Sequence, residues 1–121
     1  MVQNTPQSVL QTYIDGSRDL DRARLAPCFH PQGILTGFLA GQAIRGTPEL
    51  FLADVEKMAA AGMRNTAYQA RVENLVVKGS VASATVVMSG FAGLNFQDFM
   101  HLVEENGHWS IISKLFTTTA N

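Results

Sequence analysis

The side chains best suited to acid–base chemistry are concentrated in two segments near the C-terminus. Asp98 and His101 lie in one apolar segment, and Lys114 lies in the next. If these segments are strands of a hairpin that turns at Asn106-Gly107, Asp98 faces Lys114 across the ladder. A carboxylate and an ammonium group on one water-excluded wall have shifted proton affinities, so they could bind an anionic or carbonyl group of a ligand. A structural ion pair is the alternative interpretation.

His101 lies on the opposite face of its strand from Asp98, because side chains alternate along a strand. If that face lines a cavity, His101 is a candidate general acid or base, since an unperturbed histidine has a pKa of about 6.5. If that face is the outer one, His101 lies in a contact with a second copy of the chain. The same hairpin geometry would set Glu104 opposite His108. Periodicity leaves both placements of His101 open.

Several further residues could contact a ligand. Tyr13 shares a helical face with Val9 and Leu10, where it is either a core aromatic or a ligand-facing hydroxyl group. His30 could lie at the mouth of a pocket, although a surface histidine is the commoner case. The other candidates are large apolar side chains that line either a pocket or the core, namely Phe38, Phe51, Met58, Phe91 and Phe99.

The sequence lacks the motifs of metal, nucleotide and nucleophile-elbow chemistry. It contains no HExxH, no CxxC, no P-loop and no GxSxG, and no GxGxxG follows a predicted strand. The histidines His30, His101 and His108 are dispersed, and no predicted helix presents a pair of them at i and i+4. We therefore expect neither a metal site nor a cofactor.

Composition argues against several classes of partner. The chain has 121 residues, a net charge of −1 and scattered basic residues, which disfavours nucleic acid and anionic membrane surfaces. Only 16% of the residues are charged, so a partner face is expected to be buried. Cys28 is the single cysteine, and no segment reaches the ~18 apolar residues of a membrane span. These features predict one cytoplasmic domain over residues 1–121.

Capping residues and hydrophobic spacing predict three helices. Thr5 caps the first helix and Gly16 ends it, while Asp19 or Asp21 caps a second, short helix. Thr47 is placed to cap the third helix, whose apolar stripe continues to residue 62. The first and third predicted helices cover residues 6–16 and 48–62, and the second runs from either cap to residue 25.

The remaining segments read as strands. Residues 28–39 and 42–45 predict two short strands, and two long hairpins follow, with turns at Lys78-Gly79 and Asn106-Gly107. Both faces of residues 81–91 are free of charge, so one face should pack on the helices and the other on a second sheet, most simply that of a second copy. The long predicted strands cover residues 68–77, 81–91, 96–104 and 109–117.

The order of these elements and several local stretches resemble a known superfamily. The stretches are VLQTY at 9–13, FHP at 29–31, NLVVKG at 74–79 and NGHWSI at 106–111, together with Asp98-Phe99, Lys114 and Phe116. The chain resembles the nuclear transport factor 2-like superfamily, a cone fold shared by ketosteroid isomerase, scytalone dehydratase and SnoaL-like polyketide cyclases. Locally it is most similar to the putative lumazine-binding branch.

The resemblance implies an α+β fold in which three helices pack on a strongly curved, mixed, mainly antiparallel sheet that forms a cone with an internal pocket. Members that stabilise an enolate use a tyrosine at the position of Tyr13. The isomerase and dehydratase members place two acidic residues or an Asp-His pair deep in the cone, whereas residues 68–91 offer only Arg71 and Glu73. That departure puts a strict isomerase mechanism in doubt.

Two functional hypotheses follow. The first is a homodimer, joined through the sheet face, whose pocket binds a small apolar or aromatic ligand. Asp98, Lys114 or His101 would orient that ligand, and Tyr13, His30 and the apolar candidates would contact it. The second is a cofactor-independent lyase, isomerase or cyclase that uses His101 or Asp98 as proton shuttle and Tyr13 as oxyanion donor. A purely structural role with no usable cavity is a third alternative.

Overall fold

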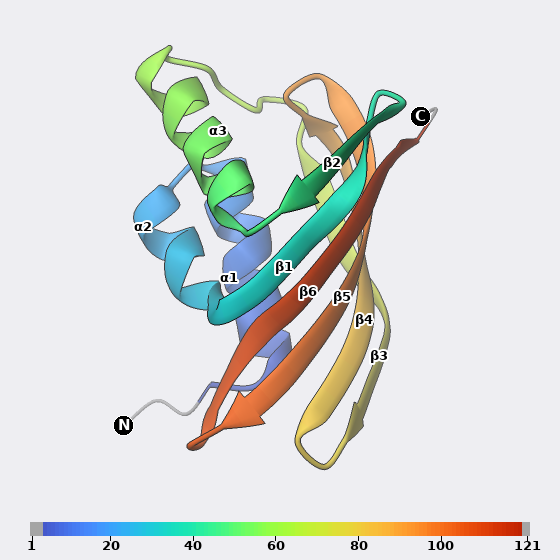
Figure 1. Cartoon of the computed structure of the whole chain (residues 1–121). Coiled ribbons are helices and arrows are strands. Elements are labelled where there is room, and N and C mark those ends of the chain that lie inside the picture. The colour runs from blue at the N-terminus through green and yellow to red at the C-terminus, as the bar shows by residue number, and fades with distance from the viewer. Residues whose placement is uncertain (1–3, 120–121) are drawn as a thin grey trace.

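The computed structural model of the chain describes residues 4–119, which form three α-helices and one six-stranded sheet (Figure 1). The helices are α1 (Pro6–Arg18), α2 (Arg22–Leu25) and α3 (Glu49–Ala60), and a 3₁₀ helix (Ala26–Cys28) follows α2. The strands are β1 (Phe29–Leu39), β2 (Gln42–Gly46), β3 (Gln69–Lys78), β4 (Val81–Phe91), β5 (Leu94–Glu105) and β6 (His108–Thr119).

The sheet is mixed and strongly curved. Its strand order is β2-β1-β6-β5-β4-β3, and β1 runs parallel to β6 while the other neighbours are antiparallel. All three helices lie on one side of the sheet, which curls around them without closing (Figure 1). The structure therefore confirms the predicted α+β cone. No helix within residues 4–119 combines the length and the apolar character needed to cross a membrane.

The helix boundaries follow the capping residues only in part. Thr5 caps α1 in a reciprocal pair with Ser8, and Asp21 caps α2, as predicted. Gly16 does not end α1, which continues for two further residues. Instead, Gly16 permits close packing, since a Cβ atom there would lie 2.9 Å from Cγ of Leu25. The predicted capping role of Thr47 is also wrong, because α3 begins after Pro48 without a side-chain cap.

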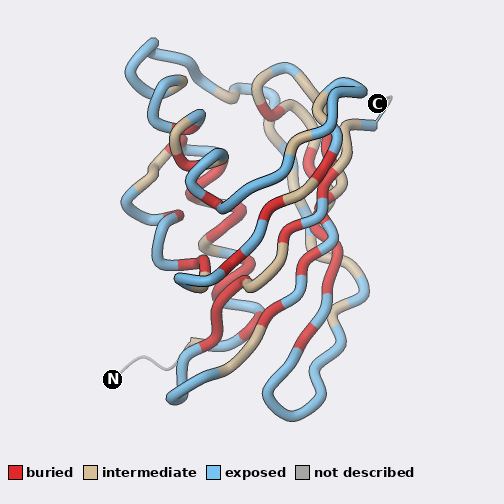
Figure 2. Tube along the Cα trace, in the orientation of Figure 1, coloured by how far each residue is buried: buried red, intermediate tan, exposed pale blue. Residues whose placement is uncertain are grey.

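The inner face of β4 is buried, whereas its outer face is exposed at the start of the strand and becomes partly covered from Thr85 onward. Figure 2 shows the burial along the whole trace. Ala82, Ala84, Val86 and Met88 point inward and are buried in one core with residues of α1 and α3. Val81 and Ser83, on the other face, are exposed. Because the helices cover a single side of the sheet, the outer face of β4 faces solvent in the isolated chain.

A bulge moves Phe91 from one face of β4 to the other. Strict alternation would place Phe91 on the outer face with Val81, but the pairing with β5 shifts between Met88 and Phe91. Gly90 lies in this shift with φ of +72°, a backbone conformation that favours glycine. The ring of Phe91 is therefore buried in the core.

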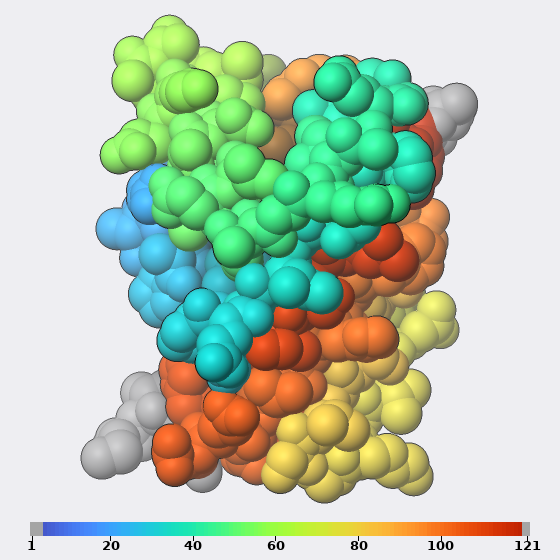
Figure 3. Space-filling view, viewed as in Figure 1, coloured from blue at the N-terminus to red at the C-terminus, as the bar shows by residue number. Residues whose placement is uncertain are grey.

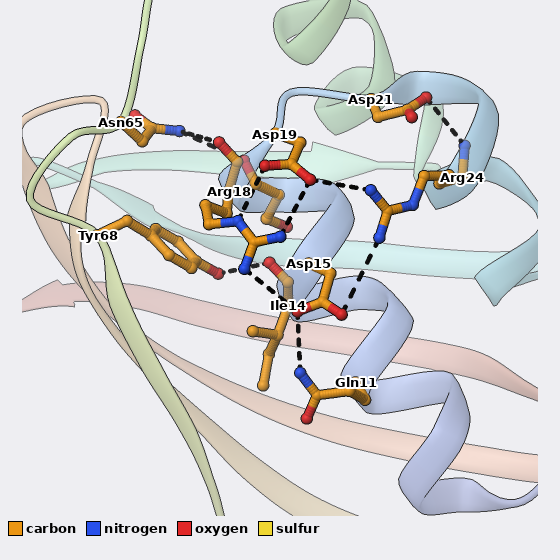
Figure 4. A network of polar contacts seen from close by, with 10 residues as sticks. Gln11, Ile14, Asp15, Arg18, Asp19, Asp21, Arg24, Asn65 and Tyr68 are labelled. Atoms are coloured by element: carbon orange, nitrogen blue, oxygen red, sulfur yellow. Dashed lines mark hydrogen bonds and ion pairs between the residues drawn. The ribbon is translucent and has the colours of Figure 1, made fainter.

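An exposed polar network joins α1 to α2 at the back of the helical layer (Figure 4). Asp19 accepts hydrogen bonds from Arg18 and Arg24, and these hold the pKa of its carboxyl group at about 2. The Tyr68 hydroxyl donates to the Ile14 carbonyl at 2.9 Å and so ties the approach to β3 to α1. Solvent screens such surface ion pairs, so the network orients the helices more than it stabilises them.

Candidate functional site

A cavity of about 270 Å³ lies between α3 and the inner face of the sheet. β1, β2, α3, β4, β5 and β6 all contribute to its wall. In Figure 3, α3 and the β1–β2 hairpin border this region, and orange atoms of the chain between β4 and β5 are visible between them. Its wall is mainly apolar, with side chains that include Leu35, Phe51, Met58, Phe91, Phe96 and Phe116.

Lys114 is the buried charged residue of this wall. It lies on β6 opposite Leu35 of β1 and Met100 of β5, and only 5% of its surface is exposed. A second bulge directs it inward, because the β5–β6 pairing shifts between His101 and Leu102 and leaves Ile112 as an extra residue in β6. Without that extra residue, Lys114 would pair with Phe99 and point to the outer face.

The predicted register of the last hairpin is wrong, although the predicted grouping of Asp98 with Lys114 is right. The turn at Asn106-Gly107 has two residues with positive φ, so it closes on the pair Glu105–His108 and not on Glu104–His108. With the bulge included, Asp98 pairs with Phe116 and Lys114 pairs with Met100. Asp98 and Lys114 are therefore diagonal neighbours on one face.

The ammonium group of Lys114 lies over aromatic rings. Its Nζ atom is 3.6 Å from the ring centroid of Phe51, 5.0 Å from that of Tyr13 and 5.6 Å from that of Phe116. Phe51 continues through edge and tilted contacts to Tyr13, Phe29 and Phe91. The cation is thus held by the negative faces of π-systems within a chain of packed rings.

Tyr13 and Asp98 form a buried hydrogen-bonded pair beside Lys114. The Tyr13 hydroxyl donates to Oδ2 of Asp98 at 2.6 Å, and neither residue is exposed to solvent. Oδ1 of Asp98 has no hydrogen-bond partner among residues 4–119. A buried oxygen without a partner carries a substantial desolvation cost, so the carboxyl group is held here against its intrinsic preference for water.

Burial shifts the proton affinities of all three groups toward their neutral forms. Desolvation raises the pKa of Asp98, although Lys114 and the bond from Tyr13 act in the opposite direction. Desolvation lowers the pKa of Lys114 against the opposing effect of Asp98. Desolvation raises the pKa of Tyr13 well above its usual value, and the nearby carboxylate adds to that shift. The arrangement can donate hydrogen bonds and move protons without a permanent ion pair.

The structure brings together six of the candidate residues. Phe51, Met58, Phe91 and Lys114 line the cavity, and Tyr13 and Asp98 adjoin it beneath the Lys114 ammonium group. Tyr13 thus has the inward orientation expected of it, while its hydroxyl bonds to a side chain and not to backbone.

Three other candidates lie outside the cavity. His101 is exposed on the outer face, where it pairs with Ser83 and Ser113. Of the two placements left open by the sequence, the outer one is therefore correct. His101 cannot transfer a proton to a ligand in the cavity from this position. Phe99 shares that outer face and is 45% exposed. Phe38 of β1 is also on the outer face, because it aligns with Thr117 and alternates with the inward Gly37. Strand alternation accounts for all three.

His30 lies away from the cavity in a contact between β1 and β5. Its Nε2 atom is 2.7 Å from Oε1 of Glu105, and its Nδ1 atom accepts a hydrogen bond from the backbone of Gln32. Arg71 and Glu73 form an exposed ion pair on β3 at 2.6 Å. These contacts are structural, and none of the three residues contributes to the cavity wall.

Two charged residues of the cavity wall, Asp54 and Lys57, were not predicted from the sequence. Both are exposed and lie on the face of α3 that carries Phe51 and Met58. The spacing of 51, 54 and 58 is that of one helical face, so this signal was present in the sequence. Asp54 and Lys57 are charged members of a stripe whose other members are mainly apolar, so the apolar pattern alone does not mark them.

Comparison with known proteins agrees with this geometry. Residues 2–117 match the family described as "Putative lumazine-binding". The fold and its cavity define a nuclear transport factor 2-like cone protein, as the solved structures below also indicate. Within that class, the chain belongs to the putative lumazine-binding family. A search of curated proteins finds no match to this sequence.

Several solved structures have the same fold. An NTF2-like protein of unknown function from Shewanella baltica superimposes with a TM-score of 0.85 and 21% identity, covering 95% of this chain and 91% of that one. An NTF2-like protein of unknown function from Silicibacter pomeroyi superimposes with a TM-score of 0.80 and 24% identity, covering 93% of this chain and 92% of that one. A "Putative calcium/calmodulin-dependent protein kinase type II association domain" from Thiobacillus denitrificans superimposes with a TM-score of 0.75 and 10% identity, covering 99% of each chain.

Proposed function

We propose that this protein binds a small apolar or aromatic molecule in the cavity between α3 and the sheet. The observation that carries the proposal is an apolar space of about 270 Å³ that has one buried cation, Lys114, in its wall. Ligand sites are typically apolar clefts with a few placed polar groups. A dry apolar cavity of ~150 Å³ accommodates benzene, so this space suits a ligand of one or two rings.

The description of the family supports an aromatic ligand. Lumazine is a planar bicyclic compound with carbonyl groups, and such a molecule could stack among Phe51, Phe91 and Phe96 while a carbonyl oxygen meets Lys114. The expected ligand is therefore flat and mainly apolar, with an acceptor group on one edge. Asp98 and Tyr13 would orient that edge indirectly by fixing the position of Lys114.

Calorimetric titration tests the proposal with a panel of one-ring and two-ring aromatic compounds that includes lumazine and acceptor-free analogues. A Met58→Trp variant should abolish binding because it fills the cavity, whereas Phe38→Ala, outside the cavity, should leave affinity unchanged. Absence of binding across the panel, or equal effects of the two substitutions, would refute ligand binding at this site. Thermal melting of each variant confirms that it is folded.

A second candidate function is cofactor-independent lyase, isomerase or cyclase chemistry. The 2.6 Å hydrogen bond between Tyr13 and the buried Asp98 favours it, because burial raises the pKa of this carboxyl group and makes it a better proton acceptor than an exposed carboxylate. With His101 on the outer face, the shuttle in this proposal is Asp98 and the oxyanion donor is Tyr13. Unchanged turnover of an active substrate by Asp98→Asn and Tyr13→Phe variants would exclude the proposal.

We also propose that two copies associate through the outer face of the sheet. Phe99 and Leu115 are neighbours across β5 and β6 and are 45% and 47% exposed, and Val81 and Ile34 add further apolar surface on the same face. An uncovered sheet face with this composition is typical of an interface. The association domain among the structural relatives lends this proposal limited support, because it is similar in fold alone.

A cytoplasmic location remains a proposal. Cys28 is the single cysteine of the chain, and burial raises the pKa of its thiol to about 11, so it stays protonated and unreactive. A chain without a possible internal disulfide is compatible with a reducing compartment. Fractionation of the native host with an antibody against the protein would test this location.

A further inference from the structure

Lys114 is the buried group whose surroundings do not explain its presence. No hydrogen bond or ion pair to its Nζ atom is formed by residues 4–119, and its closest described contact is the ring of Phe51. A structural lysine would be expected to pair with Asp98, yet the carboxylate bonds to Tyr13 and leaves Oδ1 without a partner. The amine is thus free to meet a molecule that enters the cavity.

The setting of this amine favours nucleophilic chemistry. A lysine is nucleophilic only when it is neutral, and desolvation in an apolar pocket increases the neutral fraction. Burial lowers the pKa of Lys114, and the opposing effect of Asp98 is smaller. The ring of Phe51 also favours the charged form. Asp54 and Lys57, the other charged residues of the cavity wall, are exposed.

We propose that Lys114 captures a small aromatic aldehyde or ketone in the cavity as an imine. The inference rests on the proposed ligand-binding function, because the carbonyl compound must occupy the same space. It is supported by the position of Nζ in the cavity wall, by its lack of a protein partner and by the aromatic side chains that would stack against the ring of the ligand.

The reaction balances without a further reagent. The lone pair of the neutral Nζ atom forms a bond to the carbonyl carbon as the carbon–oxygen π bond breaks, and one of the two Nζ protons passes to the oxygen to give a carbinolamine. The nitrogen then loses its second proton, the carbon–oxygen bond breaks, and the oxygen leaves as water with both protons. Asp98 and Tyr13 are placed beside the amine and could hold a proton between these steps.

Reductive trapping tests the proposal on the intact chain. The protein is incubated with benzaldehyde and sodium cyanoborohydride at pH 7, and the benzylated lysines are quantified by peptide mass spectrometry. The chain contains three lysines, and two of them are internal controls: Lys57 is exposed at the same cavity, and Lys78 is exposed at the β3–β4 turn. Lys114 should be labelled more than either control by a factor on the order of ten.

The labelling of the three lysines either supports or overturns the proposed imine. Selective labelling of Lys114 that disappears when the protein is unfolded in urea, and that benzyl alcohol suppresses by competition, would support the imine. Equal labelling of all three lysines, or selectivity that survives unfolding, would overturn it. If calorimetry shows that benzyl alcohol or benzoate binds while Lys114 stays unlabelled, this inference fails and the proposed binding function stands; if nothing binds, both fail.

Variants add a second line of test. Lys114→Met should lose the cavity adduct, and the matched Lys78→Arg change, at an exposed lysine away from the cavity, should retain it. Should Lys114→Met fail to fold, the site-resolved labelling of the unmodified chain still gives the answer.

Discussion

The hydroxyl of Tyr13 on α1 donates a hydrogen bond of 2.6 Å to Asp98 on β5, and both residues are completely buried. This bond joins the first helix to the middle of the sheet. Asp98 is also a diagonal neighbour of Lys114 across β5 and β6, and its charge favours the protonated form of that lysine. The Tyr13–Asp98 pair therefore contributes both to the packing of the core and to the electrostatics of the site.

Removal of the Tyr13 hydroxyl should destabilise the protein. Tyr13→Phe leaves both oxygens of Asp98 without a partner in a dry environment, and we expect a loss of about 1–3 kcal/mol in the free energy of unfolding. Urea denaturation measures the loss. Tyr68→Phe is the matched control, since it removes a less buried bond to the Ile14 carbonyl and should cost less. A larger effect at Tyr68 would contradict this ranking.

Replacement of Lys114 by an apolar residue should stabilise the fold. Methionine has a similar length and does not need solvation, so Lys114→Met should raise the free energy of unfolding by about 1–3 kcal/mol while weakening the binding of any ligand with an acceptor group. Chemical denaturation and calorimetry measure the two effects. A less stable variant would mean that the lysine serves the fold and not a ligand.

Asp98 should make stability fall as pH rises. Its pKa is raised in the folded state, so below the unfolded value of about 3.9 both states are protonated. Above that value the unfolded chain releases the proton first, and stability decreases by up to ~1.4 kcal/mol per pH unit until the folded carboxyl group also ionises. Asp98→Asn removes this dependence. If the free energies of unfolding of the two proteins change with pH in the same way between pH 4 and 8, the raised pKa of Asp98 is contradicted.

Gly37 should control the shape of the cavity through Phe116. A Cβ atom at this position would collide with the Phe116 carbonyl oxygen and with its ring, which lines the cavity. We expect Gly37→Ala to cost about 1–3 kcal/mol and to reduce ligand affinity. Gly16→Ala is the control, because its added methyl group meets the side chain of Leu25, which does not line the cavity, so it should lower stability without changing affinity. Calorimetry that shows equal affinity for both variants would argue against a role of Phe116.

The proposed association of two copies depends on the outer face. Phe99→Lys places a charge in the middle of that face and should convert a dimer to a monomer without lowering the melting temperature. Light scattering after gel filtration measures the mass. Val77→Lys introduces the same charge at an exposed position near the end of β3 and should leave the dimer intact. A monomeric unmodified protein would exclude the association.

Helix caps, turns and the inward face of the first helix could be predicted from the sequence, because contacts between near neighbours determine them. Thr5 and Asp21 cap helices because their side chains satisfy backbone donors three residues away. The existence of two glycine-containing hairpin turns could also be predicted, because Gly79, Asn106 and Gly107 adopt positive φ, although the first turn lies at residues 79–80 and not at Lys78-Gly79. The placement of Tyr13 on the inner face of its helix followed from the 3.6-residue period.

The composition of the site depended on the tertiary structure, because two bulges change the faces of strands. Residues 112 and 90 shift the register so that Lys114 and Phe91 point inward, and no local pattern marks those shifts. The choice between the two faces of β5, which excludes His101 and buries Asp98, was decided by the side of the sheet that the helices cover. Both outcomes depend on packing between segments far apart in the chain, whereas the caps and turns needed only their nearest neighbours.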